Sequence, residues 1–254
     1  MRSDSPSDAR SSDARTLVSV ATYNEAENIR PLVQAIRQAV PDAGILITDD
    51  GSPDGTGDLA DALAAELADV HVIHRQGKQG LGTAYLAAFE FAIADDRDVV
   101  VTMDSDFSHA PNSVPALLAA MHAGPHDLVI GSRYIEGGGI EGWPRSRHVM
   151  SGLVNRYTRL LFGTRVRDCS GGFRAYRVAK LKTVDWSRQV AKGYAFLEEV
   201  LYRCEAAGFR VGEVPIVFRD RERGSSKINR GEAISAVKDL AWVCLRDRVL
   251  GRKS

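Results

Sequence analysis

Two aspartates separated by one residue, Asp104 and Asp106, follow an apolar run in the segment VTMDSDFSHAP. Carboxylates this close repel each other, so a cation lies between them, one of them holds a proton, or both face water. A residue-skipping pair can direct both carboxylates from one loop at Mg²⁺ or Mn²⁺, whose other positions go to phosphate oxygens and water. Such a pair is common by chance, so whether it indicates a metal site depends on where the fold places it.

Two further polar clusters follow apolar runs, TYNEAEN at 22–28 and DDGSPDGT at 49–56. The first can be a simple helix start with Asn24 as its cap, and the second a simple turn. Paired carboxylates at a strand end also suit the hydroxyls of a ribose or the edge of a base. The chain has neither G-x-G-x-x-G after its first apolar run nor G-x-x-x-x-G-K-[ST] anywhere, so a bound nucleotide would need a cation on its diphosphate.

Short β-branched runs alternate with longer segments of helical spacing, which predicts an α/β fold with a doubly wound, mostly parallel sheet flanked by helices. The expected strands are 17–21, 44–48, 70–74, 98–103 and 127–131, and the expected helices are 24–39, 56–68, 80–94 and 112–122. Ligands of such sheets bind at the carboxyl ends of the strands. The three polar clusters all fall at those ends, and their joint placement favours a site.

Composition narrows the class of protein. Lys plus Arg (33) equals Asp plus Glu (33), so the net charge is zero and we expect no nucleic-acid partner. The three cysteines are widely spaced, which suits a reducing, cytoplasmic compartment. Residues 1–15 are rich in Ser, Asp and Arg, so we expect a disordered tail. No window approaches the roughly 18 apolar residues that span a bilayer.

The ordered motifs resemble the family 2 glycosyltransferases of GT-A fold, and more narrowly the polyprenyl- or dolichyl-phosphate mannose synthases. The motifs are VATYNEAENI, ITDDGSPDGT, GKQGLGTAYLAAF, VTMDSDFSHAP, VIGSRYIEGG, RDCSGGFRAYR and GYAFLEEVLYRCEAAGFRVGEVPIVFRDRERGSSKI. The resemblance runs from about residue 17 to 230. We therefore expect a glycosyltransferase domain at 16–230 and a C-terminal amphipathic, membrane-interfacial helix at 231–254.

The resemblance implies inverting transfer of mannose from GDP-mannose to a polyprenyl monophosphate, which yields polyprenyl-phosphate β-mannose. By motif match, the donor-binding residues are Tyr23, Glu25, Asp50, Lys78, Asp104, Ser105 and Asp106. Asp104 and Asp106 would also hold the metal, Mg²⁺ or Mn²⁺. Ser108 stands where some relatives have a glutamine ligand, so a third protein ligand is not expected. Ala21 stands where the family commonly has proline, and we expect this departure to affect only the entry angle of the TYNEAEN loop.

A phosphate monoester has its second pKa near 6 and is already an anionic nucleophile at neutral pH, so the enzyme needs cations more than a base. By family position, the residues for the acceptor phosphate are Arg133, Arg147, Arg221, Lys227, Asp168 and Ser170, and the catalytic residues are Asp106, Arg133, Arg221 and Lys227. Each arginine can instead be a solvated surface charge. Asp168 can instead pair with Arg167 or Arg174. RERGSSK can be a flexible turn or a loop that closes over both phosphates.

Two segments offer contact with a membrane. A helix over 146–162 gathers on one face Val149, Met150, Leu153, Val154, Tyr157, Leu160 and Leu161. The C-terminal segment gathers Ile234, Val237, Ala241, Cys244 and Leu245, with Trp242 between Lys238 and Arg246 on the other side. Either stripe can pack on the core. We predict peripheral attachment to the cytoplasmic membrane face, through these helices or through a separate anchoring protein.

Other functions fit parts of the pattern. A UDP-glucose-dependent synthase would use the same lipid phosphate, and a transferase to a hydroxyl would need a base such as Glu198 or Glu199. A non-catalytic nucleotide-sugar sensor would not need the acceptor cations. A nucleotidyltransferase would show a glycine- and arginine-rich loop after the first strand, and VATYNEAEN is not one.

Overall fold

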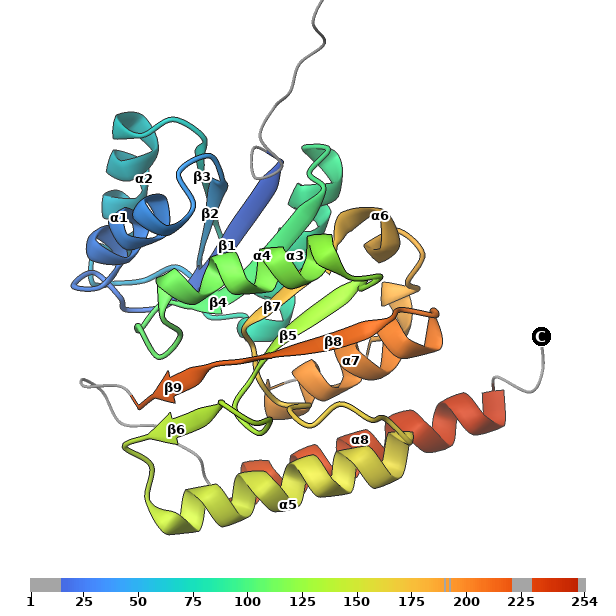
Figure 1. Cartoon of the computed structure of the whole chain (residues 1–254). Helices are drawn as coiled ribbons and strands as arrows, with labels where there is room; N and C mark the ends of the chain where they lie inside the picture. Colours follow the sequence, from blue (N-terminus) through green and yellow to red (C-terminus); the bar gives the residue numbers. More distant parts are fainter. Residues whose placement is uncertain (1–14, 190, 192, 221–229, 251–254) are drawn as a thin grey trace, which may run out of the picture.

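The computed structural model describes residues 15–189, 191, 193–220 and 230–250 (Figure 1). The strands are β1 (Thr16–Thr22), β2 (Gly44–Asp49), β3 (Val70–His74), β4 (Val99–Asp104), β5 (Leu128–Ser132), β6 (Gly139–Glu141), β7 (Arg174–Arg177), β8 (Val211–Pro215) and β9 (Val217–Arg219). The helices are α1 (Ile29–Ala39), α2 (Thr56–Glu66), α3 (Leu81–Ala94), α4 (Val114–Ala123), α5 (Arg145–Phe162), α6 (Val178–Leu181), α7 (Phe196–Ala206) and α8 (Arg230–Leu250). The expected tail lies outside the described residues, except for Arg15.

Seven strands form the main sheet in the order β3-β2-β1-β4-β7-β5-β8. All its neighbours pair in parallel except β7, which runs antiparallel between β4 and β5. The expected mostly parallel, doubly wound sheet is confirmed. The chain leaves β5 at the carboxyl edge and enters β7 from that same edge, so β7 must run in the opposite direction. As a result, residues 168–173 lie at the edge where the polar clusters were expected.

The apolar strands are buried on both faces, which explains their continuous hydrophobic runs. On one face, Val18 and Val20 of β1 pack with α1, α2 and α4, and on the other face Leu17 packs with α3, α6 and α7. The sheet is therefore a rigid platform, covered on both sides, for the loops at its carboxyl edge (Figure 1).

The first helix differs from its expected bounds. It was expected over 24–39 but begins at Ile29, and Asn24 has a φ of +63°. Asn24 therefore lies in a loop and does not cap the helix, so the simple reading of TYNEAEN as a helix start is wrong. The other three expected helices hold to within a few residues, although a short 3-10 turn at Pro111–Ser113 precedes the last of them.

Helices α5 and α8 lie side by side along one edge of the molecule (Figure 1). The Tyr157 hydroxyl of α5 donates to the Val237 carbonyl of α8 at 3.2 Å. Among the residues of α8 whose burial the structure describes, 237–247, the buried ones are Leu240, Val243 and Cys244. The stripe expected on this helix is therefore divided, because Cys244 is buried while Val237 and Leu245 are exposed. Within the described part of the chain, no helix has the length and apolar character needed to span a bilayer.

Candidate functional site

The polar clusters meet at the carboxyl edge of β1, β2 and β4. The sheet register sets Thr22 opposite Asp49 and Ala21 opposite Asp104. The loops that follow these strands, 22–28, 49–56 and 104–110, are therefore neighbours, as the sequence predicted.

Loops 22–28 and 49–56 are joined by hydrogen bonds. The backbone amide of Asn24 donates to Ser52 Oγ at 3.0 Å, and that of Glu25 donates to Thr56 Oγ1 at 2.9 Å. Asn24 adopts its positive φ inside this arrangement. Such strained residues persist where their surroundings hold them, which is typical of functional loops. The DDGSPDGT segment is thus a turn, and it also shapes the loop next to it.

The Asp50 carboxylate already has more protein partners than we expected for a residue that binds a nucleoside. It is 6 % exposed, and it forms an ion pair with Arg75 at 2.7 Å between Oδ1 and Nη1. Its Oδ2 accepts hydrogen bonds from the backbone amides of Gln79 and Gly80, at 3.2 and 3.0 Å. The Asp50 carboxylate thus occupies the backbone amides at the start of α3.

Tyr23 and Lys78 are brought together at the open end of these loops. The Lys78 ammonium lies 4.5 Å from the centre of the Tyr23 ring, and this ring is 37 % exposed. A cation over an exposed aromatic ring can contact both the flat face of a base and a phosphate. Both residues were predicted to bind the donor.

The loop after β4 holds the aspartate pair. Asp104 and Asp106 are half-buried, and Ser105 between them is 7 % exposed. Asp106 Oδ1 accepts the Ser108 backbone amide at 3.0 Å and also the Ser108 hydroxyl. Ser108 therefore holds the Asp106 carboxylate in place through two hydrogen bonds.

The surroundings of the pair fit a divalent cation. Two half-buried carboxylates on one loop supply the hard oxygen atoms that Mg²⁺ and Mn²⁺ prefer. A Cβ on Gly172 would lie 2.9 Å from the Tyr85 hydroxyl and 3.7 Å from Asp104 Oδ1. The backbone thus approaches Asp104 closely, and this space tolerates no side chain.

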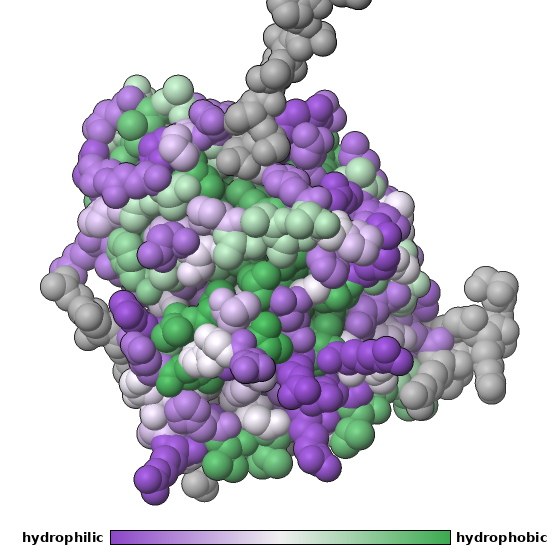
Figure 2. Space-filling model, in the orientation of Figure 1, coloured by the Kyte–Doolittle hydropathy of each residue, from purple (hydrophilic) through white to green (hydrophobic). Residues whose placement is uncertain are grey.

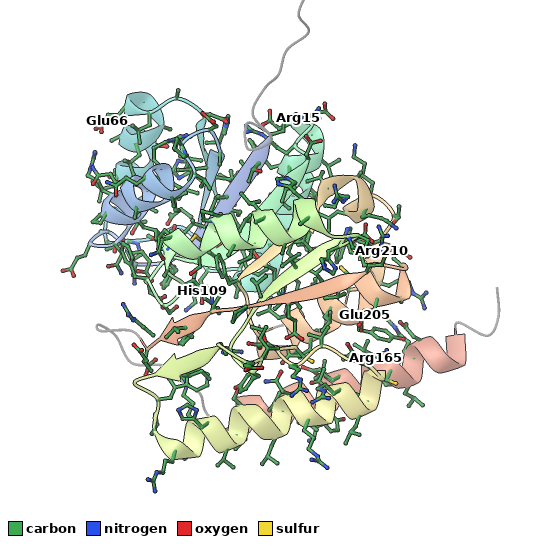
Figure 3. All side chains as sticks on the ribbon, in the orientation of Figure 1. Arg15, Glu66, His109, Arg165, Glu205 and Arg210 are labelled. Atoms are coloured by element: carbon green, nitrogen blue, oxygen red, sulfur yellow. The ribbon has the colours of Figure 1, made fainter. Side chains whose placement is uncertain are left out.

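His109 was missed by the sequence analysis, although it supports the same loop. The backbone amide of Asp104 donates to His109 Nδ1 at 3.1 Å, and the imidazole stacks on Phe173 with ring centres 5.2 Å apart. Burial lowers the pKa of His109, so the ring is neutral and Nδ1 can accept. Figure 3 shows His109 beside β9, where it also meets the ring of Phe218. Its position five residues after Asp104 was the one available signal.

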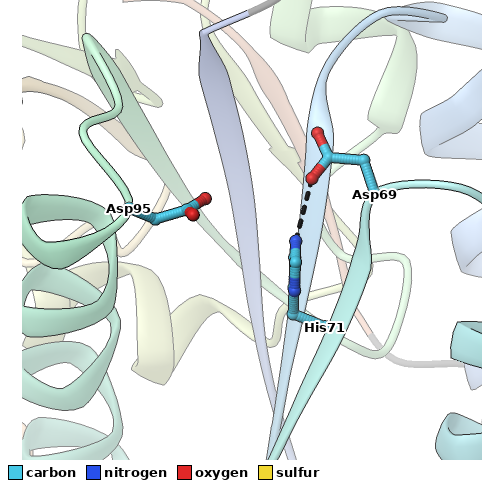
Figure 4. Close-up of side chains that lie close together, drawn as sticks. All are labelled: Asp69, His71 and Asp95. Atoms are coloured by element: carbon cyan, nitrogen blue, oxygen red, sulfur yellow. Dashed lines mark hydrogen bonds and ion pairs between the residues drawn. The ribbon is translucent and has the colours of Figure 1, made fainter.

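A second acidic group gathers Asp69, His71 and Asp95, whose ligand atoms lie within 4.8 Å of one another (Figure 4). Asp69 precedes β3 and Asp95 follows α3, so the group lies at the opposite edge of the sheet. Arg97 forms ion pairs with Asp69 at 2.5 Å and with Asp95 at 2.6 Å. The Arg97 guanidinium thus already neutralises these carboxylates, and we do not assign a metal ion to this group.

Arg133 is held by Asp168 in a buried ion pair. Arg133 Nε and Nη2 donate to the two oxygens of Asp168, each at 2.7 Å, and Nη2 also donates to Ser170 Oγ at 2.9 Å. Burial alone would raise the pKa of Asp168, but the charge and hydrogen bonds of Arg133 outweigh it and lower that pKa. The partner of Asp168 is thus Arg133, and neither Arg167 nor Arg174 was the right alternative.

Arg174 has a different role. It is fully buried, and its guanidinium donates to the carbonyl oxygens of Gly171, Cys169 and Leu197 at 2.6 to 2.9 Å. These bonds fix the segment 168–172 against the start of α7. Arg174 is therefore the residue that shapes the glycine-containing loop next to Asp104.

Arg147 lies on the indole of Trp143, with its guanidinium carbon 3.9 Å from the ring centre. Its Nη1 donates to Asp220 Oδ1 at 2.8 Å. Asp220 follows β9, and the amide of Arg219 in β9 donates to the Ser108 carbonyl at 3.2 Å. Arg147 is therefore linked to the aspartate loop through Asp220 and β9. Arg221 and Lys227 lie outside the described residues.

The two glutamates of FLEEV differ sharply. Glu199 accepts hydrogen bonds from Gln189, Ala191 and Arg203, which is a structural role. Glu198 is 3 % exposed, and its Oε2 has no hydrogen-bond partner among the described residues. Burial raises the pKa of Glu198 to about 7. Only Glu198 keeps the properties of a candidate base.

Comparison with known sequences and structures supplies the context for this geometry. Residues 17–185 match the family Glycosyl transferase family 2. A polyprenol monophosphomannose synthase of Mycolicibacterium smegmatis is 46% identical over 236 residues, which cover 92% of this chain and 89% of that protein. An undecaprenyl-phosphate mannosyltransferase of Micrococcus luteus is 42% identical over 242 residues, covering 92% and 99%.

Among solved structures, the chain resembles glucosyl-3-phosphoglycerate synthase from Mycobacterium tuberculosis in complex with Mn²⁺, UDP-glucose and phosphoglyceric acid. The TM-score is 0.67 at 20% identity, over 92% of this chain and 82% of that one. The complex of that enzyme with Mn²⁺, UDP and glucosyl-3-phosphoglycerate gives a TM-score of 0.64 at 20% identity, over 93% and 82%. At this level of identity the likeness concerns the fold alone.

Proposed function

Because the chain belongs to glycosyl transferase family 2, we propose that it transfers mannose from GDP-mannose to a polyprenyl monophosphate with inversion, which yields polyprenyl-phosphate β-mannose. The names of the two relatives, which match along nearly their whole lengths, support the mannosyl group and the lipid phosphate. The observation that carries the proposal is the hydrogen bond between Arg219 and Ser108, because it joins the aspartate loop to the strand that leads to the Asp220–Arg147 pair.

On the donor side, Tyr23 and Lys78 take the nucleoside end of GDP-mannose, with Glu25 beside them. Asp50 acts through Arg75 and the amides of 79–80, which it holds in place. Asp104 and Asp106 hold the divalent cation, with Ser105 between them. When bound, this cation offsets the negative charge that develops on the leaving diphosphate.

On the acceptor side, the residues bind and orient a second anion. Arg133, fixed by Asp168 and Ser170, supplies a buried positive charge, and Arg147 supplies a more accessible one. Arg221 and Lys227 complete the set in this proposal. The acceptor phosphate attacks as an anion, so the chain needs no group to remove a proton from it.

Glu198 favours one alternative, transfer to a hydroxyl, because a carboxylate with a pKa of about 7 suits a general base at neutral pH. The burial of Glu198 weighs against it. Glu198 is 3 % exposed, and burial of this degree leaves little access to a sugar hydroxyl. Glu198→Gln would lower hydroxyl transfer by about a hundredfold or more, whereas transfer to a lipid phosphate would stay within a few fold.

The same proposal includes peripheral attachment to the cytoplasmic face of a membrane, through α5 together with α8. Helix α5 exposes apolar side chains and buries polar ones. Asn155 and Thr158 are buried, while Val149, Leu153 and Leu160 are 63, 59 and 76 % exposed. Figure 2 shows hydrophobic side chains along the edge where Figure 1 places α5. Apolar side chains flanked by arginines suit the headgroup region of an anionic bilayer.

Arginines and a tryptophan accompany the apolar face. Arg145, Arg156 and Arg159 of α5 are exposed, and so is Trp242 of α8 at 55 %. We expect the full chain to sediment with vesicles that contain phosphatidylglycerol, and much less with pure phosphatidylcholine. The double change Leu153→Ser/Leu160→Ser should abolish this binding. Unchanged binding of that variant would exclude the α5 face, and no binding by the unmodified chain would point to a separate anchor.

The activity is tested by incubating the full chain in detergent with labelled GDP-mannose and a short polyprenyl phosphate, with labelled UDP-glucose in a parallel reaction, each with and without EDTA. We expect lipid-linked label from GDP-mannose alone, lost with EDTA. Product from UDP-glucose alone would show that GDP-mannose is the wrong donor. Product from neither would favour a hydroxyl acceptor or a nucleotide-sugar sensor.

A further inference from the structure

Two arginines contact the same indole on the acceptor side. The guanidinium carbons of Arg147 and Arg133 lie 3.9 and 5.6 Å from the centre of the Trp143 ring. Each arginine also has one carboxylate partner, Asp220 for Arg147 and Asp168 for Arg133. Trp143 therefore holds two positive charges near each other, and each charge has its own counter-anion.

The two pairs differ in burial. The side chains of Arg133 and Asp168 are 7 and 0 % exposed, while those of Arg147 and Asp220 are 20 and 29 % exposed. Separating a buried pair leaves an uncompensated charge out of water, whereas a partly exposed pair can exchange its partner at small cost. Of the two ion pairs, Arg147–Asp220 is thus the one in which an anion from solution can displace the carboxylate.

Arg147 and Trp143 form a site, here called the phosphate seat, in which hydrogen-bond donors outnumber the described acceptors. Arg133 meets Asp168 with two nitrogens, but Arg147 meets Asp220 with Nη1 alone. Arg147 Nε and Trp143 Nε1 are both buried, and neither has an acceptor among the residues that the structure describes. Buried donors of this kind normally have partners, so acceptor oxygens for these two nitrogens are lacking among the described residues.

The position of Asp220 links this seat to the aspartate loop. Asp220, Asp106 and Ser108 line one cavity of about 800 Å³. An anion that replaced the Asp220 carboxylate would therefore lie beside the loop that carries Asp104 and Asp106. A phosphate monoester carries about two charges and three terminal oxygens, against one charge and two oxygens for a carboxylate.

We propose that Asp220 is a resident counter-anion, which occupies an Arg147–Trp143 phosphate seat until the phosphate of the acceptor displaces it. This inference rests on the proposed function for the identity of the phosphate ester, but the seat is defined by residues alone. Asp220 keeps Arg147 on the indole while no substrate is present. Trp143 is a positioning residue, which acts by fixing the guanidinium plane of Arg147.

The test is calorimetric titration of the full chain, without metal or nucleotide, with inorganic phosphate and separately with farnesyl phosphate. Asp220→Asn removes the competing charge, so both ligands should bind about fivefold more tightly, a change in the range of a partly exposed ion pair. Arg147→Ala should lose most of the binding. In the Arg147→Ala background, Asp220→Asn should have no further effect, because the two residues act on one seat.

The matched control is Glu141→Gln. Glu141 pairs with Arg219 at 3.0 Å on the same β6–β9 edge, so this change removes one negative charge nearby and leaves Arg147 untouched. An equal gain in Glu141→Gln and Asp220→Asn would show a general charge effect and overturn the proposal. A loss of affinity in Asp220→Asn, in a variant that melts at the wild-type temperature, would also overturn it.

The two ligands separate this inference from the proposed function. If the Asp220→Asn gain appears with both phosphates but the chain transfers no mannose, the seat stands and the activity fails. If transfer to polyprenyl phosphate is observed but Asp220→Asn binds farnesyl phosphate as the unmodified chain does, the activity stands and the seat is wrong. Trp143→Phe should keep much of the affinity, whereas Trp143→Leu should lose it, which distinguishes an aromatic support from simple packing.

Discussion

On the donor side, loops 22–28 and 49–56 hold each other through backbone amides that donate to side-chain oxygens, and Asp50 is fully engaged by Arg75 and two amides. On the acceptor side, Arg147 depends on one partly exposed carboxylate and keeps a buried donor without a described partner. We infer that the proposed donor side is built before substrate binds, while the proposed acceptor side is completed by the substrate. Arg133 and Asp168 are the exception, because they lie on the acceptor side but are buried like core residues.

The largest expected effect concerns that exception. Asp168→Asn should lower the free energy of unfolding by about 3 to 5 kcal/mol, because it leaves the buried Arg133 charge without its partner. Asp220→Asn, its counterpart on the exposed pair, should cost less than about 1 kcal/mol. Urea denaturation of both variants measures the difference. Equal losses would mean that burial does not separate the two pairs.

Asp106→Asn should break the donor side. It removes one carboxylate from the proposed cation site, so kcat for mannosyl transfer should fall by roughly a hundred- to a thousandfold, with weaker Mn²⁺ binding by the same variant. The control is Asp69→Asn, which changes the acidic group already occupied by Arg97. If Asp69→Asn weakened Mn²⁺ binding and Asp106→Asn did not, the metal would be assigned to the wrong edge of the sheet.

Glu198 should make the free energy of unfolding depend on pH. The pKa of this carboxyl is about 7 in the folded chain against 4.5 as its ordinary value. From about pH 4.5 to 7 the folded chain binds more protons than the unfolded chain, so the free energy of unfolding falls as pH rises.

The change Glu198→Gln should remove this dependence. At pH 8 the variant should be more stable than the unmodified chain by on the order of 3 kcal/mol, and near pH 4.5 the difference should vanish. Thermal or urea denaturation across this range measures it. A difference that does not vary with pH would mean that Glu198 is ionised in the folded chain.

The smallest expected effect concerns the support of the aspartate loop. His109→Phe keeps an aromatic ring against Phe173 but loses the acceptor for the Asp104 amide. Mn²⁺ affinity, measured by electron paramagnetic resonance in the presence of GDP, should fall about tenfold, as for other residues that orient metal ligands. His109→Asn, which can still accept, should recover part of it. Equal affinity in all three proteins would reduce His109 to a packing role.

The fold was predicted well where one local signal was enough. β1, β2, β4 and β5 are apolar runs covered on both faces, and each of the five expected runs lies within one residue of the observed strand. β7 was not predicted, because its sequence RAYR gives no such signal. It is a strand because it pairs with β4 and β5, and such long-range pairing is not visible in the local sequence.

The candidate site was predicted in the same uneven way. Asp104 and Asp106 could be found because they are close in sequence and follow a strand. Asp220 and Trp143 could not, because their importance comes from Arg147, which lies 73 residues before Asp220 in the chain. The aspartate pair is local in sequence and could therefore be found directly, whereas the contacts of Arg147 with Trp143 and Asp220 are set by tertiary packing.

Steady-state kinetics of Arg147→Ala with GDP-mannose and a short polyprenyl phosphate would show whether the proposed donor and acceptor sides bind their substrates separately. We expect KM for the lipid phosphate to rise about tenfold or more, while KM for GDP-mannose stays within about twofold of the unmodified chain. Equal increases in both KM values would contradict this expectation, because Arg147 would then serve donor and acceptor alike.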